Sequence, residues 1–95
     1  MKKFTITVTS ASTKTYRSQL VEIANASNEV ELAGEGSQNL RLFWQGGKAD
    51  DLKNATKVTL LDENRGFAFG GELSTATPPR DVAEGVEFFL VRATL

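Results

Sequence analysis

Apolar and polar residues alternate along much of this chain, and this alternation restricts its fold more than any other feature. Near the N-terminus, Phe4, Ile6 and Val8 alternate with three threonines. Successive side chains of a β-strand point to opposite faces, so the pattern predicts a strand with one apolar face and one hydroxyl-bearing face. Comparable stretches predict about six mainly antiparallel strands, at residues 3–10, 29–33, 39–45, 56–62, 67–73 and 85–95.

Residues 13–26 fit two kinds of secondary structure. Tyr16, Leu20 and Ile23 recur at helical spacing, whereas Val21 and Ile23 would share one face of a strand. The helical pattern is favoured, so the expected fold class is α+β and β-rich, with at most one helix, over residues 13–26. If this segment is instead a strand, the chain is an all-β sandwich or a small barrel.

Glycines and prolines mark the expected turns and irregularities. Gly66 suits the left-handed position of the loop that joins two predicted strands. The pair Gly70-Gly71, inside a strand pattern, indicates a bulge. Two consecutive prolines predict an irregular segment at 75–80, because proline fixes φ and lacks a backbone donor. Neither a repeat nor a linker divides the sequence, so residues 1–95 are expected to form a single domain.

The absence of two residue types restricts the chemistry. The 95 residues include neither histidine nor cysteine. A Ser–His–Asp or Cys–His catalytic arrangement, a cysteine zinc site and an iron–sulfur cluster all require one of them. The acidic loop at 62–66 departs from a calcium-binding loop because its glycine comes at the fifth position and not the sixth. We therefore expect no enzymatic activity, no cofactor and no metal site.

Charge and hydropathy indicate where the chain works. It carries 11 basic and 12 acidic residues, a formal net charge of −1, which argues against a broad basic surface for duplex nucleic acid. No apolar run approaches the roughly 20 residues of a membrane span. The basic start at Lys2 and Lys3 is followed by alternating threonines and not by the apolar segment of a signal peptide. The expected location is cytoplasmic, without a membrane partner.

A short match to a nucleic-acid-binding motif suggests a first binding hypothesis. Arg65-Gly66-Phe67-Ala68-Phe69 resembles the first five positions of the octamer of the RNA recognition motif, whose aromatic side chains stack on bases. The next three residues, Gly-Gly-Glu, depart from that octamer, and the first predicted strand lacks the partner hexamer. In this hypothesis Phe67 and Phe69 stack on a ligand, with Arg65 beside them.

The single tryptophan suggests a second binding hypothesis. Trp44, with Arg41 and Lys48 nearby in sequence, could present an aromatic and polar surface to a sugar or a base. The competing interpretation places Trp44, Phe67 and Phe69 in the core. Aromatic residues at alternate strand positions pack in a core more often than they bind ligands, so the sequence favours the core.

Two classes of function follow from these patterns. The favoured one is a small non-enzymatic interaction module that binds a protein partner or self-assembles. An exposed edge on the threonine-rich first strand would permit pairing with another chain, so a homo-oligomer is expected. The alternative is binding of single-stranded nucleic acid or carbohydrate through an aromatic sheet surface.

Overall fold

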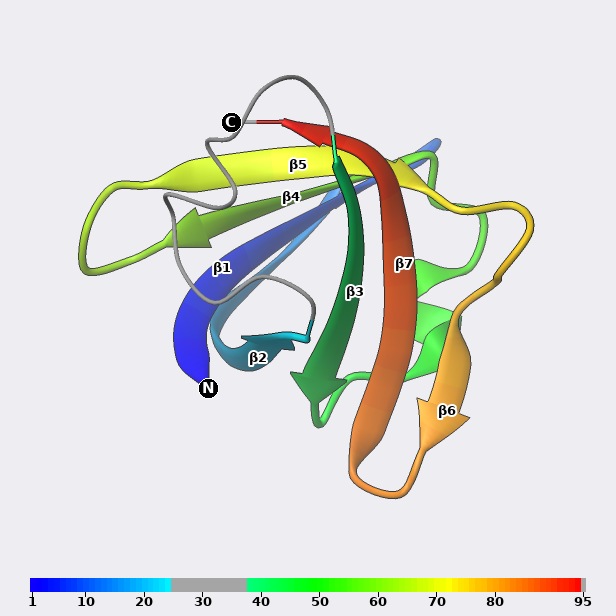
Figure 1. Cartoon of the computed structure of the whole chain (residues 1–95), viewed down its shortest axis with the longest axis horizontal. Coiled ribbons are helices and arrows are strands. Elements are labelled where there is room, and N and C mark those ends of the chain that lie inside the picture. Colours follow the sequence, from blue (N-terminus) through cyan, green and yellow to red (C-terminus); the bar gives the residue numbers. More distant parts are fainter. Residues whose placement is uncertain (25–37, 95) are drawn as a thin grey trace.

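The alternating segments form strands that close into a barrel (Figure 1). The computed structural model describes residues 1–24 and 38–94. Six strands follow one another around the barrel in the order β1–β2–β3–β7–β5–β4, every neighbouring pair is antiparallel, and β4 pairs back to β1. Their bounds are β1 Lys2–Thr9, β2 Lys14–Ile23, β3 Gln38–Gln45, β4 Lys57–Asp62, β5 Ala68–Leu73 and β7 Gly85–Thr94.

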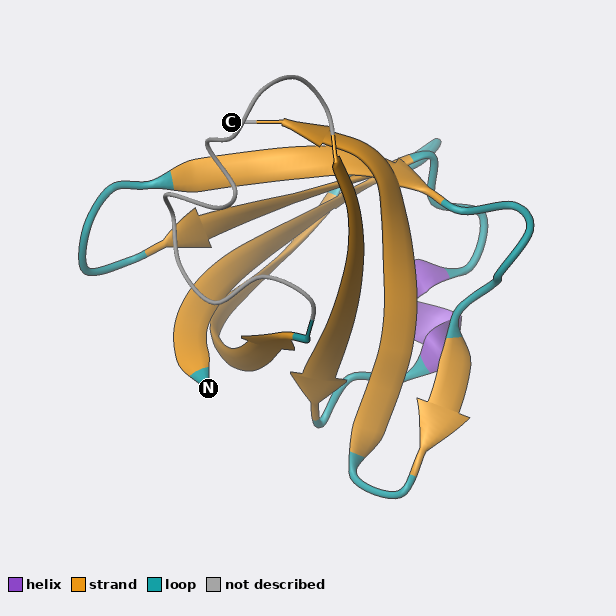
Figure 2. Cartoon of the chain, in the orientation of Figure 1, coloured by secondary structure: helices purple, strands orange, loops and turns teal. Residues whose placement is uncertain are grey.

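Two short elements lie outside the closed sheet. The strand β6 (Arg80–Val82) pairs with the first half of β7 and with no other described strand. The 3₁₀ turn η1 (Ala49–Leu52) connects β3 to β4, and Figure 2 shows it as the one helical element in the described part of the chain. Leu52 of this turn is buried and belongs to the hydrophobic core.

The fold class is confirmed: the chain is β-rich and mainly antiparallel, and the small barrel is the architecture it adopts. The helix expected over residues 13–26 is wrong, because β2 occupies most of that segment. Tyr16 pairs with Ile6 and Gln19 pairs with Phe4, so β2 advances three residues over a stretch in which β1 advances two. This bulge interrupts the alternation of period two, and the interrupted pattern is what gave residues 13–26 their helical spacing.

The inward-facing side chains form one hydrophobic core. Alternate positions of β1, β3, β4, β5 and β7 are buried, as the sequence pattern requires, whereas β2 contributes the single buried residue Val21. Phe4 of β1 meets Phe69 of β5 edge to face, with ring centroids 5.7 Å apart. The buried apolar residues are Phe4, Ile6, Val8, Val21, Leu40, Leu42, Trp44, Leu52, Val58, Leu60, Phe69, Val86, Phe88, Leu90 and Ala93.

Most predicted strands and turns agree with the structure. Five of the six expected strands correspond to β1, β3, β4, β5 and β7, and the sixth, at residues 29–33, lies outside the described residues. Gly66 has a φ of 68°, as expected for its loop. The strand β6 was not predicted, because it begins at Arg80, at the end of the segment expected to be irregular.

The acidic loop at 62–66 is a turn that the side chain of its first residue, Asp62, holds in place. Asp62 is buried, and its Oδ1 accepts hydrogen bonds from the backbone N–H groups of Asn64 at 3.0 Å and Arg65 at 3.3 Å. An aspartate that bonds the backbone two and three residues later is the usual device of such turns. The first residue of this loop is therefore a structural element of the β4–β5 connection.

The expected edge strand is not an edge. Strand β1 lies between β2 and β4 and is hydrogen-bonded on both sides. The premise that its threonine-rich edge pairs with another chain is therefore wrong, because barrel closure removes that edge. Within the described residues, the three-residue strand β6 pairs on one side alone, and residues 14–20 of β2 pair with β1 but not with β3.

Candidate functional site

The aromatic residues singled out in the sequence lie largely inside the barrel. Trp44 is 1 % exposed, and its Nε1 donates a hydrogen bond to Oε1 of Gln19 at 2.9 Å. The Tyr16 ring packs against the indole with centroids 5.0 Å apart. Phe69 is 2 % exposed, and the half-buried Phe67 packs against it at 5.9 Å. Trp44 and Phe69 therefore present no open face for stacking on a ligand.

The basic residues of the same hypotheses lie apart from one another. Arg41 is on the outer face of β3, where its Nε and Nη2 donate to Oε2 of Glu87 at 2.9 and 2.7 Å. Lys48 precedes the start of β4, and Arg65 follows the end of that strand. The structure therefore does not gather Arg41, Lys48 and Arg65 at one place on the surface.

Glu87 is the centre of a small cluster of charges on the outer surface. Its Oε1 accepts a hydrogen bond from Nη2 of Arg80 at 3.0 Å, in addition to the two from Arg41. The hydrogen bonds from Arg41, followed by the one from Arg80, hold the pKa of the Glu87 carboxyl below its ordinary value. This cluster ties β6 and β3 to β7, and each carboxylate oxygen of Glu87 accepts from one of the two arginines.

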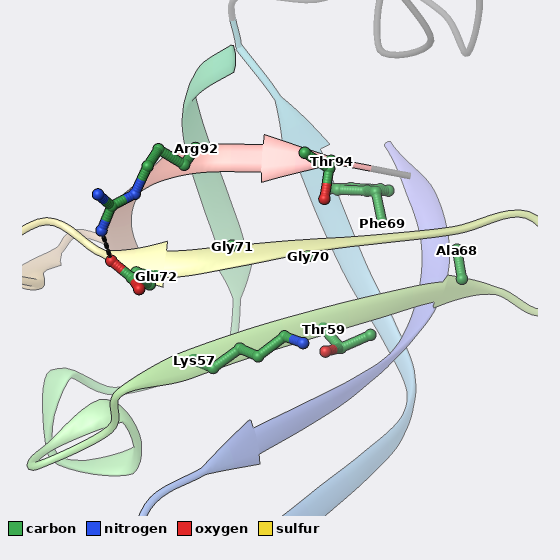
Figure 3. Close-up of a pocket in the computed structure, with 9 residues that line it drawn as sticks. All are labelled: Lys57, Thr59, Ala68, Phe69, Gly70, Gly71, Glu72, Arg92 and Thr94. Carbon is green, nitrogen blue, oxygen red and sulfur yellow. Dashed lines mark hydrogen bonds and ion pairs between the residues drawn. The ribbon is translucent and has the colours of Figure 1, made fainter. Parts of the chain in front are cut away.

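A groove on the outer face of β5 is the strongest candidate site. We call it the β5 groove; its volume is about 370 Å³, and Figure 3 shows the side chains around it. Strands β4 and β7 form its two walls, and the glycine pair of β5 forms its floor. Its lining residues are Lys57, Thr59, Ala68, Phe69, Gly70, Gly71, Glu72, Arg92 and Thr94.

The groove exists because β5 has no side chain at its centre. Gly70 faces outward between Thr59 of β4 and Thr94 of β7, which are its cross-strand partners. A Cβ on Gly70 would lie 2.9 Å from the backbone oxygen of Val58 and 3.0 Å from Thr59 Oγ1, so the close approach of β4 requires glycine here. Any larger residue would fill the floor and displace β4.

The wall of the groove that β7 forms contains a β-bulge. From Gly70 to Glu72 on β5, the partners on β7 run from Thr94 back to Val91, so β7 contains the additional residue. The irregularity expected at the glycine pair is present, and the extra residue belongs to the neighbouring strand. Arg92 has a φ of 54° at this bulge, and its exposed side chain extends to Glu72 at one end of the groove (Figure 3).

The charges around the groove are unevenly paired. Lys57 and Glu72 are directly opposite in the β4–β5 register. Glu72 nevertheless forms an ion pair with Nη2 of Arg92, across β5 from Lys57. Lys57 makes no ion pair with any residue that the structure describes, and Figure 3 shows its ammonium group extending along β4 toward the Thr59 hydroxyl. With two cations and one anion, the lining has an excess of positive charge.

A second hollow lies at one end of the barrel. It measures about 460 Å³, between η1 and the loop that carries Pro78 and Pro79. Its lining exposes more apolar than polar surface, with Leu52 and Leu73 among its residues, whereas the β5 groove exposes the two in similar measure. Of the two, the β5 groove is the better binding site for a polar ligand.

The chemistry available in the β5 groove is hydrogen-bond donation. Lys57 contributes an ammonium, Arg92 a guanidinium, and Thr59 and Thr94 two hydroxyls. In the described parts of the chain, no three or more acidic side chains gather as a metal site would require. Nor does any helix in those parts have the length and apolarity to cross a membrane. Such donors suit recognition of a ligand rich in oxygen acceptors.

Sequence reasoning missed all five polar residues at this site, although part of the signal was present. Alternation already placed Lys57 and Thr59 on the polar face of their strand, next to a strand containing Gly70-Gly71. Pairing of β5 with β7, which brings Arg92 and Thr94 to the other wall, depends on barrel closure. None of the protein families, curated proteins or solved structures compared with this chain matches it, so its function is inferred from this geometry.

Proposed function

We propose that this chain is a small non-enzymatic interaction module that binds a protein partner through the β5 groove. The observation that carries the proposal is the glycine floor between two walls of hydrogen-bond donors, Lys57 and Thr59 on β4 and Arg92 and Thr94 on β7. A polypeptide segment carries a carbonyl acceptor on every residue, and a floor without side chains lets it approach the β5 backbone closely.

The rigidity of the barrel supports a preformed site. Every strand of the barrel is hydrogen-bonded to two neighbouring strands. The two strands that form the groove walls, β4 and β7, have inner faces packed in the buried core. No buried side-chain polar atom in the described residues lacks a hydrogen-bond partner. A site on such a scaffold loses little conformational entropy on binding, which favours affinity.

Binding of nucleic acid or carbohydrate is the less favoured function. Proteins that bind single strands or sugars use exposed aromatic faces as stacking platforms. Here the aromatic residue that lines the β5 groove, Phe69, is directed into the core.

Native mass spectrometry of gently purified protein tests the proposal. The wild-type chain is compared with Thr94→Trp, which places a large side chain over the groove. Thr15→Trp, at an exposed position on β2, is the matched control. We expect wild type and Thr15→Trp to retain a polypeptide mass in addition to the 10.3 kDa chain, and Thr94→Trp to lose it.

Two results would argue against this function. Retention of the same polypeptide by Thr94→Trp would place binding elsewhere on the molecule. A clean multiple of 10.3 kDa, or an added mass that corresponds to a nucleotide or a sugar, would replace the protein partner by self-assembly or by the alternative ligand class.

A further inference from the structure

We infer that the β5 groove recognises a carboxylate of its partner, and that the partner segment is an extended acidic peptide held by Lys57. This inference rests on the proposed function, since it names the chemistry of the partner that the groove would take. Its basis is the arrangement of charges and hydroxyls on the two walls.

Lys57 is the cation available for a ligand. Its direct cross-strand neighbour Glu72 is engaged by Arg92, and no other described residue forms an ion pair with the Lys57 ammonium. Lys57 is exposed, so its charge remains solvated and accessible. Arg92 is held at one end of the groove by Glu72, which leaves Lys57 as the group that a carboxylate can pair with without breaking an existing ion pair.

Two threonines provide the remaining donors. Thr59 and Thr94 are the cross-strand neighbours of Gly70 on either side, and Figure 3 shows their hydroxyls on opposite walls with Gly70 between them. A carboxylate has two oxygens and about four acceptor sites, so it can pair with an ammonium and also accept hydrogen bonds from hydroxyls. Hydrogen bonds to a charged acceptor are shorter and stronger than neutral ones.

The excess positive charge of the groove lining favours an acidic ligand over a basic or neutral one. The chain as a whole has a formal net charge of −1, whereas the groove lining has one cation in excess. A basic or neutral segment would leave Lys57 without a counter-charge. An extended peptide with an acidic residue at every second position presents its carboxylates on one face, as the strand repeat dictates. Small residues between them allow its backbone to lie close to Gly70.

The test is an NMR titration of the folded protein with two capped hexapeptides. One peptide alternates glutamate and glycine, and the other has glutamine in place of each glutamate. We expect the glutamate peptide to give saturable shifts of the amide resonances of Thr59, Gly70 and Thr94. Because the glutamine peptide keeps the length and the hydrogen-bonding groups but lacks the charge, it should bind at least about tenfold more weakly.

Two matched variants separate recognition by Lys57 from general electrostatics. Lys57→Gln and Lys14→Gln remove the same charge from exposed strand positions, on β4 and on β2. We expect Lys57→Gln to weaken binding of the glutamate peptide about fivefold or more, and Lys14→Gln to change it less than about twofold. Equal effects of the two variants, or an absence of saturable shifts in the groove, would overturn the inference.

Other ligand classes and the proposed function are distinguished in the same series. The same titration is run with a hexathymidylate and with a cellohexaose. If either shifts the groove resonances with a higher affinity than the glutamate peptide, the inference is also overturned. If the glutamate peptide fails while Thr94→Trp still abolishes retention of a polypeptide, recognition of an acidic segment is wrong and the interaction module stands. If both experiments fail, the proposed function fails with the inference.

Discussion

The carboxylate of Glu63 holds Ser18, 45 positions earlier in the chain, at the bulge of β2. Oε1 of Glu63 accepts hydrogen bonds from the Ser18 backbone N–H at 2.7 Å and from Thr5 Oγ1 at 2.6 Å, and Ser18 Oγ donates to Oε2 at 3.3 Å. Ser18 has a φ of 57°, in the left-handed region that non-glycine residues rarely adopt. The loop after β4 thus stabilises a strained residue two strands away, across β1.

This relationship predicts a pH-dependent stability. The hydrogen bond from Thr5, followed by the one from the Ser18 backbone, lowers the pKa of Glu63 from its ordinary value of 4.5. A carboxyl whose pKa is lower in the folded state stabilises the fold above its unfolded pKa, and this stabilisation is lost as the pH falls through the folded pKa. Glu63→Gln should therefore lower the urea midpoint at pH 7, and the difference from wild type should narrow as the pH falls toward about 3.

The control for this prediction is Glu22→Gln, an exposed position on β2 that removes the same charge. It should change the urea midpoint little at either pH, since surface charges contribute little to stability. A gap between wild type and Glu63→Gln that stays constant from pH 7 to pH 3 would show that the Glu63 carboxylate does not hold the bulge.

Phe69 and Phe67 differ in burial, and this difference predicts unequal effects of their replacement. Phe69 is 2 % exposed and meets the Phe4 ring, whereas Phe67 is half-buried at the rim of the core. Phe69→Ala should lower the free energy of unfolding by about 3–5 kcal/mol. Phe67→Ala should lower it by about 1–2 kcal/mol, since less apolar area returns to water. Urea denaturation followed by circular dichroism measures both; equal and small effects would mean that the two rings are surface residues.

Gly85 and Gly46 require glycine for different reasons. A Cβ on Gly85 would collide with the backbone oxygen of Trp44 on the paired strand β3, whereas a Cβ on Gly46 would meet nothing within 4 Å. Gly46 instead has a φ of 81°. Gly85→Ala should therefore cost about 3 kcal/mol of stability, from overpacking against rigid backbone. Gly46→Ala should cost about 1–2 kcal/mol, from left-handed strain alone. Thermal unfolding of the two variants would contradict this account if Gly46→Ala were the more destabilised.

Local patterns predicted the strands well because each barrel strand buries one face. Phe4, Ile6 and Val8 alternate in the sequence and are all buried in the structure. The same reasoning failed at β2, where the bulge at Ser18 breaks the alternation and its stabilising partner is Glu63. A distant hydrogen bond leaves no local signature, so the local pattern of this segment favours a helix.

The candidate site was less accessible to sequence reasoning than the fold. The β5 groove combines residues from three strands, and its chemistry depends on which strands are neighbours. Gly70 and Gly71 marked the position, but Thr94 and Arg92 join it through closure between β5 and β7. For Trp44 and Phe69, the core position that the sequence favours over a ligand platform is confirmed, because the alternation of their strands directs both side chains inward.

The absence of cysteine from the chain allows a direct measurement of the central claim, that a protein partner occupies the β5 groove. Thr94→Cys and Thr15→Cys each introduce a single thiol at an exposed strand position, one at the groove and one on β2. Each variant is labelled with a benzophenone maleimide and photo-crosslinked in a lysate of its native source. The account predicts one polypeptide adduct from position 94 and none from position 15, with the adduct suppressed by excess unlabelled wild type and not by unlabelled Thr94→Trp. The same adducts from both positions, or equal competition by wild type and Thr94→Trp, would contradict it.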